Sequence, residues 1–97
     1  MKKIIIFTLA LLTGLSGYAR KPYFEAEQLI TTGAYYYPEH WDESQWERDI
    51  KKMADMGLEF IHFAEFAWAF LEPQKGQYDF AWLDKAIAIA EKHGLKI

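Results

Sequence analysis

The order of secondary-structure signals along the chain is the feature that most limits its fold. A run of β-branched and aromatic residues at 30–37 is followed by a helical pattern that ends at Gly57. A second apolar run at 58–63 is followed by a second helical pattern that ends at Gly94. Consecutive strand–helix units of this length are typical of a parallel sheet, because each helix carries the chain back to start the next strand. The sequence therefore predicts an α/β fold.

Local residues set the expected boundaries of the first unit. The predicted strand, Ile30 to Tyr37, stops before Pro38, and Asp42 precedes Gln45 by three residues, which predicts a capping box. Glu47 and Lys51 are predicted to pair on the solvent side of the helix. Its apolar face is expected to contain the residues at helical spacing, Trp46, Ile50, Met53 and Gly57.

The second unit has the same plan. The predicted strand, Leu58 to Phe63, is mostly apolar and is expected to be buried on both faces. A loop is expected over 64–78, and a helix is expected to start at Asp79. Its apolar face is expected to contain Leu83, Ala86, Ile87 and Ala90. Leu95 to Ile97 resembles the first residues of a third strand, so we expect the chain to be the beginning of a larger fold.

Residues 1–19 have the pattern of a secretory signal peptide. A basic start at Lys2 and Lys3 precedes an apolar run at 4–15, and Gly17 to Ala19 then supply small residues at the positions that a signal peptidase reads. The run is shorter than the ~20 residues of a membrane span. We therefore expect cleavage between Ala19 and Arg20, no stable membrane anchor, and export to the periplasm or outside the cell, with an uncleaved anchor as the alternative.

Composition excludes some classes of partner. Without residues 1–19, which contain Lys2 and Lys3, 9 basic residues of the original 11 face 14 acidic ones, a formal charge of −5. This balance, with no cluster of Lys and Arg, argues against a nucleic-acid partner. The chain contains no cysteine, so its stability must come from packing without disulfides. Its three histidines lack the spacing of metal ligands, and we expect neither a metal nor another cofactor.

Two clusters of aromatic and ionisable residues come directly after the two predicted strands. The first is "YYPEHW", from Tyr36 to Trp41, and the second is "HFAEFAW", from His62 to Trp68. In α/β proteins, ligands bind where parallel strands end and the next loops begin. The sequence therefore predicts one functional edge of the sheet that carries both clusters.

Within these clusters His62 and Glu65 are the candidate substrate contacts. By strand alternation His62 shares a face with Phe60, and an inward histidine needs a polar partner, which is either a ligand or a structural neighbour. Glu65 lies between Ala64 and Phe66, and a carboxylate in such apolar surroundings must be paired, hydrogen-bonded or protonated.

The other members of the clusters have simpler explanations. We expect at least one of the tyrosines at 35–37 to lie in the core, and Trp41 and Trp46 to pack against the first helix. Glu39 either favours the N-terminus of that helix or belongs to the site, and His40 is most simply a loop histidine.

Three strings of the sequence resemble the start of glycoside hydrolase family 42, the β-galactosidases. They are "GAYYYPEHWDESQWERDIKKMADMG", "EFAWAFLEP" and "GQYDFAWLDKAIAIAEKHGLKI". The resemblance implies a (β/α)₈ TIM barrel, of which residues 33–97 would form the first two βα units and the onset of the third strand, after a leader at 20–32. It also implies hydrolysis of terminal β-D-galactose with retention, no cofactor, and a homo-oligomer, a trimer by the family's pattern.

The resemblance places the catalytic acid/base and the nucleophile, both glutamates, beyond Ile97, near a fourth and a seventh strand. Glu39, Glu65 and Glu72 therefore do not take their place. The family has an arginine that contacts the sugar, in the string "RIGEFAW", where this chain has His62. His62 is carried over as a sugar contact, and the preference for galactose stays open.

Two other functions remain open from the residues alone. One is an exported, non-catalytic carbohydrate-binding module that uses the same aromatic rings to stack on sugars. The other is a barrel glycosidase that acts on a different glycan. An Asn–Glu pair near a fourth strand and a glutamate near a seventh would distinguish these alternatives.

Overall fold

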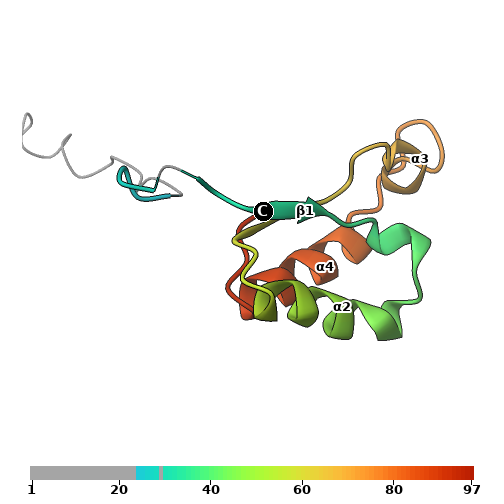
Figure 1. Cartoon of the computed structure of the whole chain (residues 1–97). Helices are drawn as coiled ribbons and strands as arrows, with labels where there is room; N and C mark the ends of the chain where they lie inside the picture. The colour runs from blue at the N-terminus through green and yellow to red at the C-terminus, as the bar shows by residue number, and fades with distance from the viewer. Residues whose placement is uncertain (1–23, 29) are drawn as a thin grey trace, which may run out of the picture.

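The computed structural model describes residues 24–28 and 30–97 (Figure 1). The predicted signal peptide and its cleavage site, Ala19 and Arg20, lie outside the described residues. Within the described part no helix is long and apolar enough to cross a membrane. The elements are, in chain order, strand β1 (Gly33–Tyr35), the 3₁₀ helix η2 (Pro38–His40), helix α2 (Glu43–Asp55), strand β2 (Phe60–His62), helix α3 (Trp68–Leu71) and helix α4 (Ala81–Lys92).

The sheet is parallel, as the order of the elements predicted. β1 pairs with β2 in a register that sets Gly33 opposite Phe60 and Tyr35 opposite His62. On the other edge of β2, Phe60 forms a parallel bridge with Lys96, and the Ile61 N–H donates to the Lys96 carbonyl at 2.8 Å. The residues after α4 therefore begin to extend the sheet, and the α/β expectation is confirmed. Both strands are shorter than predicted, with three residues each.

The core lies between the sheet and the two long helices, α2 and α4, which cover the same face (Figure 1). It contains Tyr36, Trp46, Ile50, Ile61, Ala86, Ala90 and Leu95. Ala86 and Ala90 are fully buried, and their small side chains let α4 approach the other residues of the core closely. This confirms Trp46 and Ile50 on α2, Ala86 and Ala90 on α4, and the expected core tyrosine. The prediction was wrong for Leu83 and Ile87, since Trp82 and Ile89 are the other α4 side chains that pack against the core. Burial of apolar surface at about 25 cal/mol per Å² is the main force that holds these layers together.

Trp46 and Trp41 differ from one another, although both were expected to pack against α2. Trp46 is buried, and its indole N–H donates to the carbonyl of Pro38 at 3.0 Å and to that of Trp41 at 3.2 Å. The Trp41 side chain, in contrast, is 55% exposed. The expectation was therefore wrong for Trp41.

The N-terminus of α2 is capped by Asp42. Its carboxylate accepts a hydrogen bond from the Ser44 N–H at 2.9 Å, where the predicted capping box would have used Gln45. The hydrogen bonds from Ser44 lower the pKa of Asp42, since they favour the charged carboxylate. At the other ends, Gly57 and Gly94 adopt positive φ values of 87° and 76°, as predicted for residues that end helices.

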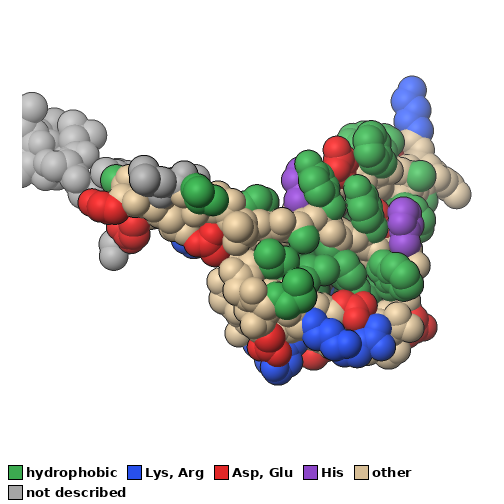
Figure 2. All heavy atoms as spheres, in the orientation of Figure 1, with side chains coloured by type: hydrophobic (Ala, Val, Ile, Leu, Met, Phe, Trp, Pro, Cys, Tyr) green, Lys and Arg blue, Asp and Glu red, His purple; other side chains and the backbone are tan. Residues whose placement is uncertain are grey.

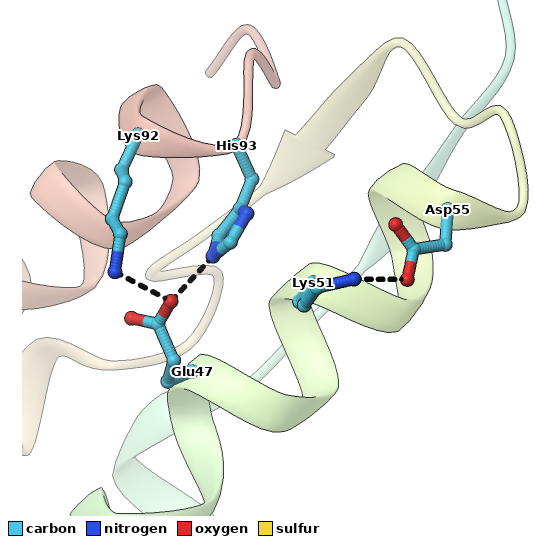
Figure 3. A network of polar contacts seen from close by, with 5 residues as sticks. All are labelled: Glu47, Lys51, Asp55, Lys92 and His93. Atoms are coloured by element: carbon cyan, nitrogen blue, oxygen red, sulfur yellow. Dashed lines mark hydrogen bonds and ion pairs between the residues drawn. The ribbon is translucent and has the colours of Figure 1, made fainter.

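The predicted pair of Glu47 with Lys51 is wrong. Lys51 bonds Asp55 one turn further along α2, with 2.6 Å between Nζ and Oδ2. Glu47 instead faces α4, where its Oε1 lies 2.8 Å from Lys92 Nζ and 2.6 Å from His93 Nε2 (Figure 3). Sequence spacing had pointed to Lys51 as the partner of Glu47, whereas the packing of α2 against α4 gives it Lys92 and His93.

Two further differences concern the second unit. The expectation that β2 is buried on both faces is wrong, since Ile61 is buried but His62 is exposed. Both helices pack on one side of the sheet, which leaves the other side uncovered by this part of the chain. The predicted loop at 64–78 contains the short helix α3, and α4 starts at Ala81, two residues after Asp79, whose carboxylate accepts from the Ala81 N–H at 3.0 Å.

Candidate functional site

The ends of β1 and β2 lie side by side, as predicted. The Tyr36 N–H donates to the His62 carbonyl at 3.0 Å, which extends the pairing one residue past β1. η2 continues from β1, and the turn at 64–67 continues from β2, so both loops leave the same edge of the sheet. Both clusters that the sequence singled out therefore lie at the carboxyl ends of parallel strands, where α/β proteins bind ligands.

His62 and Tyr35 share the sheet face that points away from α2 and α4. Ile61, their neighbour in sequence, is in the core, and alternation sends His62 to the opposite side. The Gly33 backbone approaches the Phe60 ring so closely that a Cβ at Gly33 would lie 2.5 Å from it. At the other end of the ladder the Tyr35 and His62 rings contact one another, with 4.6 Å between centroids and 41° between planes.

Glu65 lies at the centre of an unusual turn. Ala64 and Phe66, the residues on either side, have φ values of 64° and 63°, a left-handed conformation that costs non-glycine residues energy. Glu65 is half-buried, and its carboxylate lies near the Tyr37 side chain. Burial of the phenol, together with the charge of Glu65, raises the pKa of Tyr37. A residue from the loop after β1 is thus the neighbour of Glu65 in this part of the chain.

Tyr37 also begins a row of rings that connects the two loops. His40 stacks on Tyr37, with centroids 5.5 Å apart and planes 17° apart, and it lies edge-to-face with Phe70 of α3, with 6.4 Å between centroids. Figure 2 shows hydrophobic side chains gathered over the part of the molecule that holds β1 and the loops, with histidine side chains among them. Lys and Arg side chains gather along the opposite edge, over α2. The edge of the sheet that carries the loops after β1 and β2, called the site edge below, is therefore rich in aromatic rings and has few Lys and Arg side chains.

Glu39 occupies the first turn of η2, ahead of the N-terminus of α2. Its Oε2 is buried and has no hydrogen-bond partner within the described residues. The indole N–H of Trp82, in the first turn of α4, is also buried without a partner in this part of the chain. Sequence patterns did not single out Trp82, because a tryptophan at helical spacing is normally a core residue.

Residues 24–28 and 30–97 contain no group of three or more His, Cys, Asp or Glu side chains that could hold a metal ion. The side chains at the site edge are an imidazole, carboxylates, phenols and apolar rings. Such a set can bind a neutral polar molecule by hydrogen bonds and by contact with ring faces.

A comparison with protein families matches residues 35–97 to glycoside hydrolase family 42, described as β-galactosidase. The match spans both loops of the site edge. Among curated proteins, β-galactosidase Bga of Halorubrum lacusprofundi is 52% identical over 64 residues, which is 66% of this chain and 9% of that protein. A β-galactosidase of Thermus thermophilus is 46% identical over 65 residues, 67% of this chain and 10% of that protein.

Solved structures agree with these matches. The β-galactosidase from the Antarctic haloarchaeon Halorubrum lacusprofundi superposes with a TM-score of 0.66 at 49% identity, over 69% of this chain and 10% of that one. The β-galactosidase from the psychrophilic Marinomonas ef1 gives the same TM-score at 37% identity, with the same coverage of both chains. The chain thus spans about a tenth of the length of the relatives that it matches.

Proposed function

Since the chain belongs to glycoside hydrolase family 42, we propose that the full-length protein is a β-galactosidase. It hydrolyses terminal, non-reducing β-D-galactose residues and retains the anomeric configuration. The observation that carries this proposal is the family match over residues 35–97, which includes both loops at the carboxyl edge of the sheet.

In this proposal the two described units are the start of a (β/α)₈ barrel. Parallel order, one helix per strand, and a third strand that begins beside β2 support this arrangement. The face with Tyr35 and His62 then points into the barrel, and the loops after β1 and β2 contribute to its upper rim. Active sites of such barrels lie at the ends of the strands.

Retention needs two carboxyl groups about 5–5.5 Å apart, one as acid/base and one as nucleophile. We assign both roles to glutamates beyond Ile97. His62 and Glu65 contact the sugar instead: the exposed imidazole offers a donor and an acceptor, and the Glu65 carboxylate, next to Tyr37, offers acceptors. These contacts position the sugar for the reacting groups.

Hydrolysis of a p-nitrophenyl β-D-galactopyranoside by the full-length enzyme tests the proposed activity. We expect turnover, and NMR during the first minutes should show the β-anomer of galactose as the first product. If the enzyme hydrolyses only a glycoside of a different sugar, that sugar takes the place of galactose as the proposed substrate. Binding of galactosides without turnover would indicate a carbohydrate-binding module and contradict the proposed enzyme.

His62→Ala tests the proposed sugar contact. We expect kcat/KM to fall by about tenfold or more, since transition-state contacts commonly contribute this much. Because His62 ends β2 and lies outside the core between the sheet and the helices, the melting temperature should change little. Unchanged kinetics with a clearly lower melting temperature would show that His62 is structural.

We also propose that residues 1–19 direct export and are removed between Ala19 and Arg20, so that the enzyme acts in the periplasm or outside the cell. The basic start and the short apolar run of the sequence support this. N-terminal sequencing of the exported enzyme should begin at Arg20, and protein that retains Met1 would contradict cleavage. Light scattering of the same material tests a homotrimer against a monomer.

A further inference from the structure

Three tyrosines in a row, at 35–37, end in three different environments. The Tyr36 hydroxyl donates to Asp49 of α2 at 3.1 Å, on the helix side of the sheet. Tyr37 lies near the Glu65 carboxylate of the second loop. Tyr35 lies on the opposite face from Tyr36 and is 59% exposed, and within the described residues its hydroxyl forms no hydrogen bond. In this part of the chain the Tyr36 hydroxyl thus has a partner and Tyr37 has a carboxylate nearby, whereas the Tyr35 hydroxyl is available to another molecule.

Tyr35 and His62 form a preorganised pair. They are direct partners in the register of β1 and β2, so their positions are fixed by the backbone ladder. Their rings are 4.6 Å apart, which limits the rotation of each side chain. A phenol and an imidazole can each donate and accept a hydrogen bond, and the phenol ring adds an apolar face. The pair therefore presents polar groups next to a flat apolar surface, the combination that recognises a sugar ring.

The place of the pair in the sheet supports a ligand contact over a role in the core. Phe60, on the same face two residues earlier, covers Gly33 and belongs to the lower layer. Tyr35 and His62 end their strands, so they form the layer next to the loops. A tyrosine hydroxyl deep in a barrel core would need a polar partner there, whereas one in the last layer can face a bound ligand.

We propose that Tyr35 is a specificity-determining residue that donates a hydrogen bond to one hydroxyl of the bound sugar, beside His62. The proposal rests on the proposed function, since it assumes a glycoside in this site. Tyr35 fixes which hydroxyl pattern is accepted, and its ring also holds the imidazole of His62 in orientation.

The test compares the full-length enzyme with its Tyr35→Phe variant on p-nitrophenyl β-D-galactopyranoside and on the 2-, 3-, 4- and 6-deoxy analogues. Phenylalanine keeps the ring that contacts His62 and removes only the hydroxyl. We expect one deoxy analogue to lose roughly three- to tenfold more kcat/KM with the wild type than with Tyr35→Phe, because only the wild type makes the lost hydrogen bond. The other analogues should lose the same factor with both enzymes.

Tyr36→Phe is the matched control, since it removes a hydroxyl from the adjacent residue on the helix side. It should lower the melting temperature through the loss of the bond to Asp49 and leave every deoxy ratio unchanged. Equal deoxy losses for wild type and Tyr35→Phe at all four positions would overturn the proposal. A wild type that cleaves no galactoside would refute the proposed function separately, and the same comparison would then be made on the glycoside that it does cleave.

Discussion

At the scale of single residues, the backbone is strained in the turn around Glu65. Ala64 and Phe66 both adopt left-handed φ values near 60°. For residues with a Cβ this conformation costs about 1–2 kcal/mol, and such strain is common at functional sites. The alternation of left-handed residues turns the chain sharply between β2 and α3. It brings Glu65 toward Tyr37 while Ala67 is buried beneath the turn.

Ala64→Gly should stabilise the full-length protein by about 0.5–1 kcal/mol. A glycine at position 64 removes the left-handed strain. The free energy gained in this way exceeds the ~0.4–1 kcal/mol by which the greater conformational entropy of glycine stabilises the unfolded chain. The control is the same chemical change at Ala88, an exposed position within α4, which should destabilise by about 1 kcal/mol. Urea denaturation measures both, and a loss of stability at both positions would show that the turn is unstrained.

At the scale of elements, the features that depend on periodicity were predicted well from the sequence. The core residues Trp46 and Ile50 of α2, the glycines after each helix and the parallel order were confirmed, because each depends on a local pattern or on the order of the elements. On α4 the pattern identified the two buried alanines but not Trp82 and Ile89, which pack against the core where Leu83 and Ile87 were expected. The site edge was predicted too, since strand alternation and the order of elements fix where His62 points.

Features that depend on packing between elements could not be predicted. The partner of Glu47 is on α4, 45 residues away in sequence, and only the packing of the two helices selects it over Lys51. The contact between Tyr35 and His62 needs the register of β1 and β2, which no single-strand pattern contains. The helix α3 has only four residues and no side-chain cap, so it gave no periodic signal.

The contact between α2 and α4 predicts a pH-dependent stability. Hydrogen bonds from Lys92 and then from His93 lower the pKa of Glu47 below its ordinary value of 4.5 (Figure 3). A lowered folded-state pKa means that the stabilisation is complete above the unfolded-state pKa and is lost as the pH falls through the folded-state pKa. Glu47→Gln should therefore destabilise the protein at pH 7, and its difference from the wild type should shrink below about pH 4.5.

Chemical denaturation of the full-length protein at pH 7 and at about pH 3 measures this effect. Asp55→Asn is the control, because the exposed pair of Asp55 with Lys51 lies within α2 and joins no second element. It should cost less at pH 7 than Glu47→Gln. A Glu47→Gln difference that stays constant with pH would contradict the assigned role of the carboxylate.

At the scale of the whole molecule, the described part has surfaces suited to further elements. A hollow of about 530 Å³ lies beside the edge of β1 that β2 does not pair with, between that strand and α2. Its lining is mainly apolar and includes Ala34, Tyr36, Met53, Met56 and Leu58. A barrel has no free edge, because its last strand pairs with its first. In the proposed barrel this hollow is the place where the final strand and helix pack.

The last prediction is that a polypeptide of residues 20–97 alone neither folds cooperatively nor hydrolyses a β-galactoside. Its unpaired strand edges favour aggregation, and large apolar side chains such as Met56 (76%) and Phe66 (90%) are exposed. Whole domains are stable by only about 5–15 kcal/mol, and a barrel of this type takes about 250 residues, so this part lacks most of the core that supplies the margin. Hydrolysis needs two carboxyl groups across one glycosidic bond, and we assign both to residues after Ile97. A thermal melt monitored by circular dichroism and an assay with a chromogenic galactoside test the two claims separately. A sharp, reversible melt would contradict the first, and turnover above a heat-inactivated sample would contradict the second.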